Sequence, residues 1–276
     1  MIYLFLAAAF IIHSTFVFVV NLLSVPSEIM VFFRAALGFA VCVLFLLFTK
    51  RKSDKKLILK NLKFSIFSSI ALLFAWNFLY KAIASTSMTF SLLVFSVLFP
   101  LLYALSGKCD KLKRILTLVF CAVGEIFLFV FSALGKGRVS GFLMSLLAAF
   151  LVLVSVAFDR RVKKISFVES LSAKFMLISV LSGLYAFLFI PVTALNMGMK
   201  AFFLLIVLGV VHTGVFYFLA MCFWRKCEFK TLSALTLISP VLSLIFSIIL
   251  VPVSFEAIFL VPVVFILILP FVLMIK

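Results

Sequence analysis

The chain alternates long apolar runs with short polar clusters. A bilayer-crossing helix needs about 20 consecutive apolar residues, and windows of that length predict membrane spans. Ten spans are expected, at residues 3–23, 28–49, 64–80, 88–106, 115–133, 139–158, 168–190, 201–222, 231–250 and 256–275. The connections are short, so we expect no inserted soluble domain. The longest connection, KRKSDKKLILKNLK at residues 50–63, is a candidate basic surface helix.

Composition supports an all-α integral membrane protein. Of the 276 residues, 67% are hydrophobic and 12% are charged, whereas soluble domains are about 45–50% apolar. A spanning β-barrel alternates polar and apolar residues, and no such pattern is present. The first apolar run has no basic stretch before it, so we expect a span there and not a cleaved signal peptide.

The basic residues predict the orientation in the membrane. Lysine and arginine remain in cytoplasmic loops, and 19 of the 25 lie in loops on one predicted side, against four on the other, at Lys81, Lys136, Arg138 and Lys200. Both termini are therefore expected in the cytoplasm, as an even number of spans also requires. Because the formal charge of +17 is distributed in this way and no recognition module is visible, it does not indicate nucleic-acid binding.

Internal symmetry is suggested by shifting the sequence by 140 residues. The shift places Arg34 on Lys174 and Pro100 on Pro240, and each proline follows a run rich in hydroxyl groups. An odd number of spans per half inverts the second half relative to the first. The pattern predicts two inverted five-span repeats, residues 1–138 and 139–276, as in many secondary transporters.

The sequence resembles the EamA-type ten-helix permeases of the drug/metabolite transporter superfamily. The resemblance rests on RAALGF in the second span, LYKAIASTS before and into the fourth, SVLFP in the fourth and LISP in the ninth. It implies transport of amino acids or other small metabolites, often outward, across a bacterial inner membrane. It also implies a central cavity lined mainly by spans 1, 3, 4, 6, 8 and 9.

Arg34 and Lys174 are charged residues inside predicted spans. A charge at the centre of a membrane helix costs about 3 kcal/mol on insertion scales, and such residues mark solute or ion pathways. Each is either a pathway charge or an anchor that extends to the interface, with Glu28 as a possible partner of Arg34. If both line the pathway, they favour an anionic or zwitterionic solute.

Three further ionisable residues lie near the middle of predicted spans. His13 and His212 fall on cavity-lining spans of the resemblance, where each either binds solute and titrates or donates to a helix carbonyl. Glu125 is a candidate for proton coupling. Because the resemblance places span 5 outside the cavity, a neutral acid in a packing or homodimer contact is the favoured interpretation.

Aromatic and amide side chains are candidate solute contacts. Trp76 and Asn77 lie on span 3 and Tyr217 on span 8, and such groups stack on a solute or satisfy its polar edge. Pro100 and Pro240 are candidate hinges, since proline frees backbone carbonyls within a span. The buried hydroxyls are expected to pack helices: Ser91, Ser96, Ser155, Ser233, Thr236 and Ser239.

These features predict a permease or exporter of a small polar metabolite that works by alternating access. No catalytic or nucleotide-binding motif is present, so an enzyme is the least favoured class. The cysteine and histidine spacing predicts no metal site, and no cofactor is expected. The expected partners are the solute and membrane lipids. The alternatives are a flippase or exchanger of a lipid-linked or nucleotide-type metabolite, and a non-transporting membrane scaffold.

Overall fold

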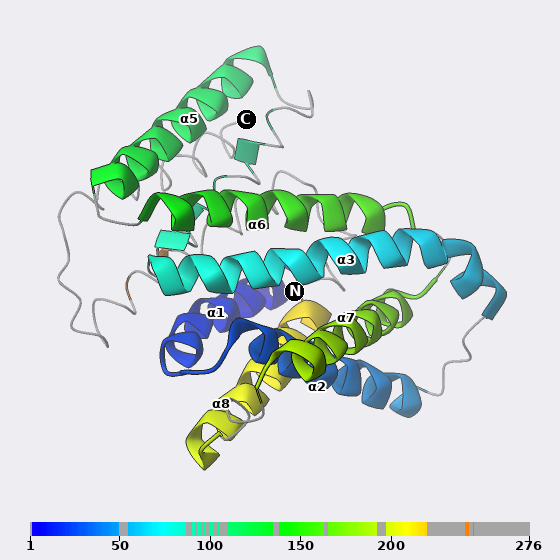
Figure 1. Cartoon of the computed structure of the whole chain (residues 1–276). Coiled ribbons are helices and arrows are strands. Elements are labelled where there is room, and N and C mark those ends of the chain that lie inside the picture. The colour runs from blue at the N-terminus through cyan, green and yellow to red at the C-terminus, as the bar shows by residue number, and fades with distance from the viewer. Residues whose placement is uncertain are drawn as a thin grey trace. The chain divides into compact units, whose positions relative to one another are not determined.

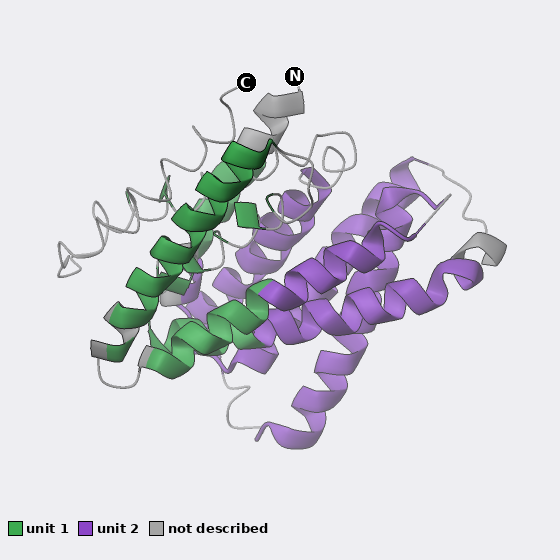
Figure 2. Cartoon of the chain, turned by 90° about the horizontal axis from the view of Figure 1, so that it is seen from above, with its two compact units in different colours: residues 1–17, 78–149, 223–276 green, residues 18–77, 150–222 purple. Residues whose placement is uncertain are grey.

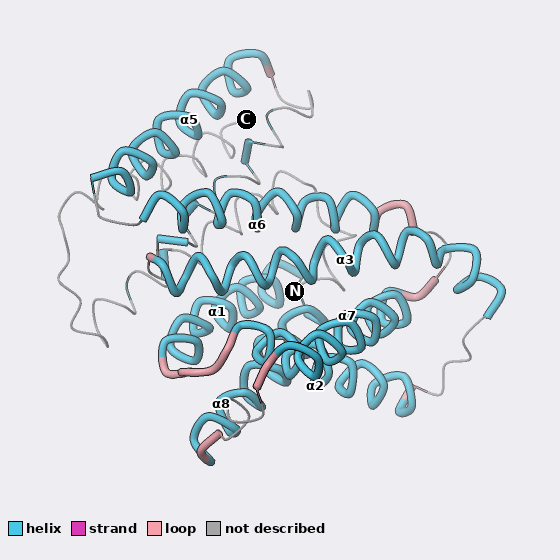
Figure 3. Tube along the Cα trace, in the orientation of Figure 1, coloured by secondary structure: helices cyan, strands magenta, loops and turns pink. Residues whose placement is uncertain are grey.

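Every described element of the computed structural model is a helix (Figures 1 and 3). The structure describes residues 2–49, 55–86, 110–134, 138–162, 165–191 and 197–219, and isolated positions between 90 and 104 and between 241 and 245. The elements are α1 (Ile2–Asn21), α2 (Ser27–Phe48), α3 (Lys55–Ser85), α5 (Lys111–Leu134), α6 (Arg138–Asp159), α7 (Phe167–Phe189), α8 (Met199–Gly209) and a π-helix, η2 (Val210–Val215).

Five of the described helices are long and apolar enough to cross a membrane. They cover Ser27–Phe48, Leu59–Ser85, Val139–Asp159, Phe167–Phe189 and Met199–Leu219. Large apolar side chains on them are exposed, among them Phe48 and Phe187 at 84% and 85%. Outward-facing apolar surface on this scale is typical of helices that contact lipid. The structure therefore agrees with the hydropathy on a helical protein with helices long and apolar enough to cross a membrane.

The predicted spans differ in how far the structure describes them. Helices α1, α2, α3, α5, α6, α7 and α8 with η2 coincide with seven of the ten. Spans 231–250 and 256–275 lie outside the described residues, apart from positions 241, 242 and 245, and span 88–106 is described only at scattered helical positions. From Lys55 onward the basic segment is part of α3, which continues without a break through the predicted span 64–80.

The chain divides into two compact units (Figure 2). Unit 1 contains residues 1–17, 78–149 and 223–276, and unit 2 contains residues 18–77 and 150–222. Each unit combines segments from both halves of the sequence. The predicted repeats, 1–138 and 139–276, are consecutive halves of the sequence. The two units are defined by packing in space, so they do not test the repeats.

Within unit 2, α2 packs against α7. A Cβ atom added at Gly38 of α2 would lie 3.0 Å from the ring of Phe175, and one at Gly183 of α7 would lie 2.9 Å from the ring of Phe32. The contact therefore moves backward along α2 as it moves forward along α7. The two helices are antiparallel, and their glycines allow the aromatic rings of the partner helix to approach closely.

Helix α2 also packs against α8 and η2 in the same unit. A Cβ atom at Gly209 would lie 2.5 Å from Cβ of Leu37 and 2.9 Å from the carbonyl oxygen of Phe33. At Gly214 it would lie 2.8 Å from Val41. Small residues that let helix backbones approach are typical of packing between membrane helices, and here they bring η2 against α2.

Candidate functional site

Arg34 is buried on α2, with 2% of its surface exposed. Its guanidinium lies over Trp76 of α3, with Cζ 4.2 Å from the ring centroid. Its Nε donates a hydrogen bond of 2.7 Å to Oγ1 of Thr213. A desolvated cation above an indole face is worth about 2 kcal/mol. Thus Arg34 of α2 is held in place by contacts from α3 and η2.

The acceptor for Arg34 is supplied by the π-helix η2. In this wider helical turn, the Thr213 hydroxyl reaches back five residues and donates a 3.1 Å hydrogen bond to the Leu208 carbonyl oxygen. Such single π-helical turns occur frequently at functional sites. Because its own hydrogen is directed to Leu208, the Thr213 oxygen is left as an acceptor for Arg34. His212 lies in the same turn and is also buried.

Three aromatic rings meet beside Arg34. Trp76 donates 3.2 Å from Nε1 to the Tyr217 hydroxyl. Phe175 lies edge-on to Tyr217, with ring centroids 5.5 Å apart, and 6.0 Å from the Trp76 ring. The structure therefore brings together Trp76 and Tyr217, which the sequence analysis proposed as solute contacts on spans 3 and 8.

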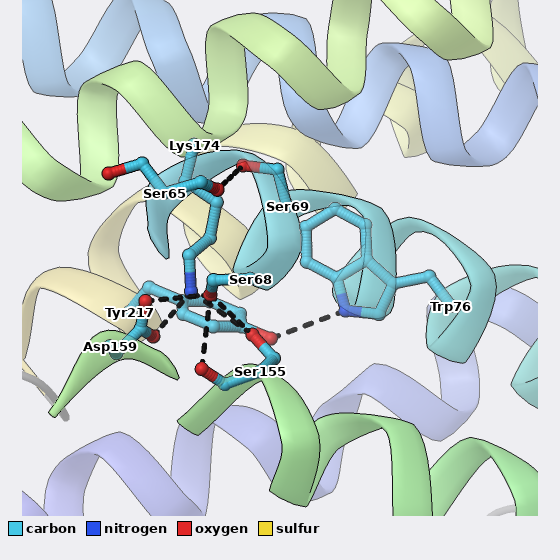
Figure 4. A network of polar contacts seen from close by, with 8 residues as sticks. All are labelled: Ser65, Ser68, Ser69, Trp76, Ser155, Asp159, Lys174 and Tyr217. Carbon is cyan, nitrogen blue, oxygen red and sulfur yellow. Dashed lines mark hydrogen bonds and ion pairs between the residues drawn. The ribbon is translucent and has the colours of Figure 1, made fainter. Parts of the chain in front are cut away.

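Lys174 is buried on α7 and forms an ion pair with Asp159, the last residue of α6 (Figure 4). Its Nζ also donates 3.2 Å to Oγ of Ser155. Ser68 of α3 donates 2.7 Å to the second carboxylate oxygen of Asp159, and its hydroxyl lies 2.9 Å from that of Ser155. Lys174 is thus neutralised within the protein, so its positive charge is not open to a solute in this state.

Glu169, which precedes Lys174 by five residues, has a separate role. Its backbone N–H donates to the Ser166 hydroxyl, and its carboxylate accepts from the Ser166 N–H at 2.9 Å. This capping box satisfies backbone donors at the start of a helix. It fixes the first turn of α7, about two turns before Lys174.

Tyr217 connects the two charged groups. Its phenol interacts electrostatically with both Arg34 and Asp159, and Figure 4 shows it between Trp76 and the Lys174 network. We call these residues, all within unit 2, the polar cluster: Arg34, Ser68, Trp76, Ser155, Asp159, Lys174, Thr213 and Tyr217. Charged side chains buried in a membrane are costly unless they are paired. Here partners from five helical segments surround the buried charges.

Asn77 adjoins Trp76 on α3 and is half-buried. Its Nδ2 donates 3.0 Å to the Leu73 carbonyl oxygen. Its Oδ1 is buried and has no hydrogen-bond partner among the described residues. An amide in a membrane helix needs partners for both groups, so the free acceptor is a candidate contact for a solute N–H or O–H.

Three of the other predicted residues, His13, Glu125 and Pro100, belong to unit 1. His13 belongs to unit 1, half-buried, with its ring stacked 5.6 Å from that of Phe16. Glu125 is half-buried on α5 of unit 1, and its Oε2 has no hydrogen-bond partner among the described residues. Pro100 is buried at a helical position, whereas Pro240 lies outside the described residues. Their roles in solute binding, proton coupling and bending stay predictions.

Three members of the cluster were missed by sequence analysis: Ser68, Asp159 and Thr213. Asp159 directly follows the predicted span 139–158 and precedes a basic loop, where a carboxylate is unremarkable. A signal was available, because Ser155 and Asp159 are four residues apart and share one face of a helix. Ser155 was interpreted as a packing residue, and the structure places its hydroxyl in the ion-pair network.

Comparison with known proteins identifies the fold alone. No protein-family model and no curated protein matches the sequence. Fourteen chains of known structure match. One of them, described only as "Crystal structure of protein", has a TM-score of 0.71 at 16% identity, over 99% of this chain and 96% of its own. The arrangement of helices is therefore one already seen in a solved protein over nearly the whole chain.

Proposed function

We propose that the chain is a secondary transporter of a small solute bearing a carboxylate, and that Arg34 binds that group. The observation that supports this most directly is a buried arginine inside a predicted membrane span, held over Trp76 and against Thr213. Guanidinium binds carboxylate through two parallel hydrogen bonds. Nε is engaged with Thr213, and the terminal nitrogens carry the remaining donors.

The aromatic rings beside Arg34 suit the rest of a small metabolite. Trp76, Tyr217 and Phe175 provide apolar faces with one hydroxyl edge, and Asn77 supplies an acceptor from the same helix as Trp76. Binding sites for small molecules combine mostly apolar walls with a few placed polar groups. An amino acid or a short organic acid fits this combination better than a lipid-linked molecule.

The proposal includes ten spans in two inverted repeats, as in EamA-type permeases. Residues 18–77, shifted by 140, become 158–217, which lies within 150–222, the other segment of unit 2. Helices α2 and α7, equivalent under the same shift, are antiparallel, as inversion of the second half requires. The basic loops support a bacterial inner-membrane protein with both termini in the cytoplasm.

The test is thermal unfolding of the purified protein with a panel of amino acids and organic acids, followed by uptake into liposomes. A solute that binds the folded state raises the melting temperature. We expect a carboxylate-bearing solute to do so. In Arg34→Gln its affinity should fall at least about tenfold, because a hydrogen bond to a charged group contributes about 1.5–3 kcal/mol.

Arg114→Gln is the matched control, since Arg114 lies exposed in the first turns of α5. It should leave both binding and uptake unchanged. A solute that binds equally well to wild type and Arg34→Gln would rule out the proposed role of Arg34. If no carboxylate-bearing solute bound or crossed the membrane, the flippase and scaffold alternatives would be favoured.

A further inference from the structure

The ion pair of Lys174 is part of a closed ring of hydrogen bonds. Lys174 donates to Ser155 and to Asp159, and Ser68 donates to the other oxygen of Asp159. The Ser68 and Ser155 hydroxyls lie 2.9 Å apart. The Ser68 hydroxyl also lies 3.1 Å from the Ser155 carbonyl oxygen, and either hydroxyl of the Ser68–Ser155 pair can be the donor, so these contacts close a ring in both cases.

This ring gives Asp159 its whole described set of partners. They are the ammonium of Lys174 from α7, the hydroxyl of Ser68 from α3 and, electrostatically, the phenol of Tyr217. Tyr217 also interacts with the charge of Arg34 on α2. On its own helix, Asp159 follows Ser155 by one turn and is followed by Arg160 and Arg161.

Addition of one proton to Asp159 would change this arrangement. The carboxylate becomes a neutral acid, and Lys174 loses the opposite charge that offsets the cost of its burial. A buried charge that has lost its partner is strongly unfavourable. Lys174 therefore requires a new anion, and the proposed solute site lies beside it, because Phe175, the next residue, packs against Trp76 and Tyr217.

We propose that Asp159 is the proton-binding residue of the transporter, and that its protonation releases Lys174 to bind the solute carboxylate together with Arg34. The proton comes from the aqueous phase, and no bond other than its O–H is made or broken. Uptake of one proton and one carboxylate leaves the charge of the site unchanged. The proposal rests on the proposed function, and it gives Lys174 a role in solute binding that depends on the protonation of Asp159.

Infrared difference spectroscopy tests the proton site without any solute. The protein is reconstituted in liposomes and taken from alkaline to acidic buffer, and the carbonyl band of a protonated carboxyl group is recorded. The chain has three aspartates, Asp54, Asp110 and Asp159, so carboxyl-labelled [4-¹³C]aspartate separates them from the glutamates. We expect, besides the bands of Asp54 and Asp110, a further label-sensitive band that remains in Asp110→Asn and Asp54→Asn and disappears in Asp159→Asn.

Two variants keep the test decisive. If Asp159→Asn fails to fold because Lys174 is left unpaired, Asp159→Asn/Lys174→Met removes both charges and should fold without the band. Glu125→Gln, the alternative proton site, should retain it. A band lost in Glu125→Gln and unaffected by aspartate labelling would overturn the assignment to Asp159, and so would the absence of any label-sensitive band beyond that of Asp54 and Asp110.

The result separates the two proposals. If solutes bind through Arg34 but Asp159 never protonates, the transporter stands and the coupling inference is wrong. If Asp159 protonates and no carboxylate-bearing solute binds, the proposed function fails first, and the coupling inference fails with it. If both hold, binding of the identified carboxylate should weaken about tenfold or more in Lys174→Met/Asp159→Asn relative to wild type at acidic pH.

Discussion

At the scale of single residues, removal of the Thr213 hydroxyl should lower the stability of the protein. Thr213→Val keeps the shape of the side chain but deletes the acceptor of the Arg34 Nε–H. A buried donor of a charged group then loses its partner, which costs about 1.5–3 kcal/mol. We expect the free energy of unfolding, measured by denaturant titration in mixed micelles, to fall by this amount.

Thr117→Val is the matched control for that substitution. Thr117 is fully buried on α5, and its hydroxyl has no hydrogen-bond partner among the described residues. The same change of atoms there removes no described hydrogen bond, so stability should be unchanged or slightly raised. Equal losses at the two threonines would show that the Arg34–Thr213 bond contributes nothing of its own.

Analysis of the sequence singled out members of the polar cluster where the chemistry was unusual and missed them where it was ordinary. Arg34 and Lys174 were singled out because charge is rare inside membrane helices. Asp159 and Thr213 were missed because a carboxylate at a span end and a threonine within a span are common. Their importance depends on their partners: Lys174 lies 15 positions from Asp159 in the sequence, and Arg34 lies 179 positions from Thr213. A single sequence does not show which distant residues are in contact.

At the scale of helices, the contact of α2 with α8 depends on the absence of a side chain at Gly209. A Cβ atom there would lie 2.5 Å from Leu37 and 2.9 Å from the Phe33 carbonyl oxygen. Backbone atoms cannot move aside as a flexible side chain does. We expect Gly209→Ala to lower the free energy of unfolding by about 1–3 kcal/mol, the usual cost of overpacking.

Gly124→Ala is the control, because a Cβ atom at Gly124 on α5 would meet nothing within 4 Å. Alanine favours the helix over glycine by about 1 kcal/mol, so this variant should be neutral or stabilised. If Gly209→Ala were equally benign, the close approach of α2 and α8 would be wrong. Both variants are compared by the same denaturant titration.

Hydropathy predicted where helices lie but not how they pack. The runs at 28–49 and 168–190 coincide with α2 and α7 to within one or two residues, because lipid requires a continuous apolar stretch. The π-helix η2 was not foreseen, since VVHTGV reads as a uniform helix. The π-helix forms beside Gly209 and Gly214, which allow α2 to approach closely. The need for this close packing cannot be recognised before the helices that pack together are known.

At the scale of the whole molecule, composition predicts membrane insertion, and the distribution of lysine and arginine predicts orientation. The cost of moving basic loops across the membrane keeps them in the cytoplasm. This argument needs no tertiary contact, so it applies equally to the segments outside the described residues. It predicts cytoplasmic termini and an external location for the loops that contain Lys136 and Lys200.

Cysteine labelling in intact cells measures this orientation. The predicted spans and cytoplasmic loops contain all five native cysteines, so a membrane-impermeant maleimide should not react with the wild type. We expect Lys136→Cys and Lys200→Cys to be labelled from outside. Lys52→Cys, in the basic connection, should be labelled only after the membrane is permeabilised. Labelling of Lys52→Cys in intact cells, with Lys200→Cys protected, would show that the predicted orientation is wrong and that the termini lie outside the cell.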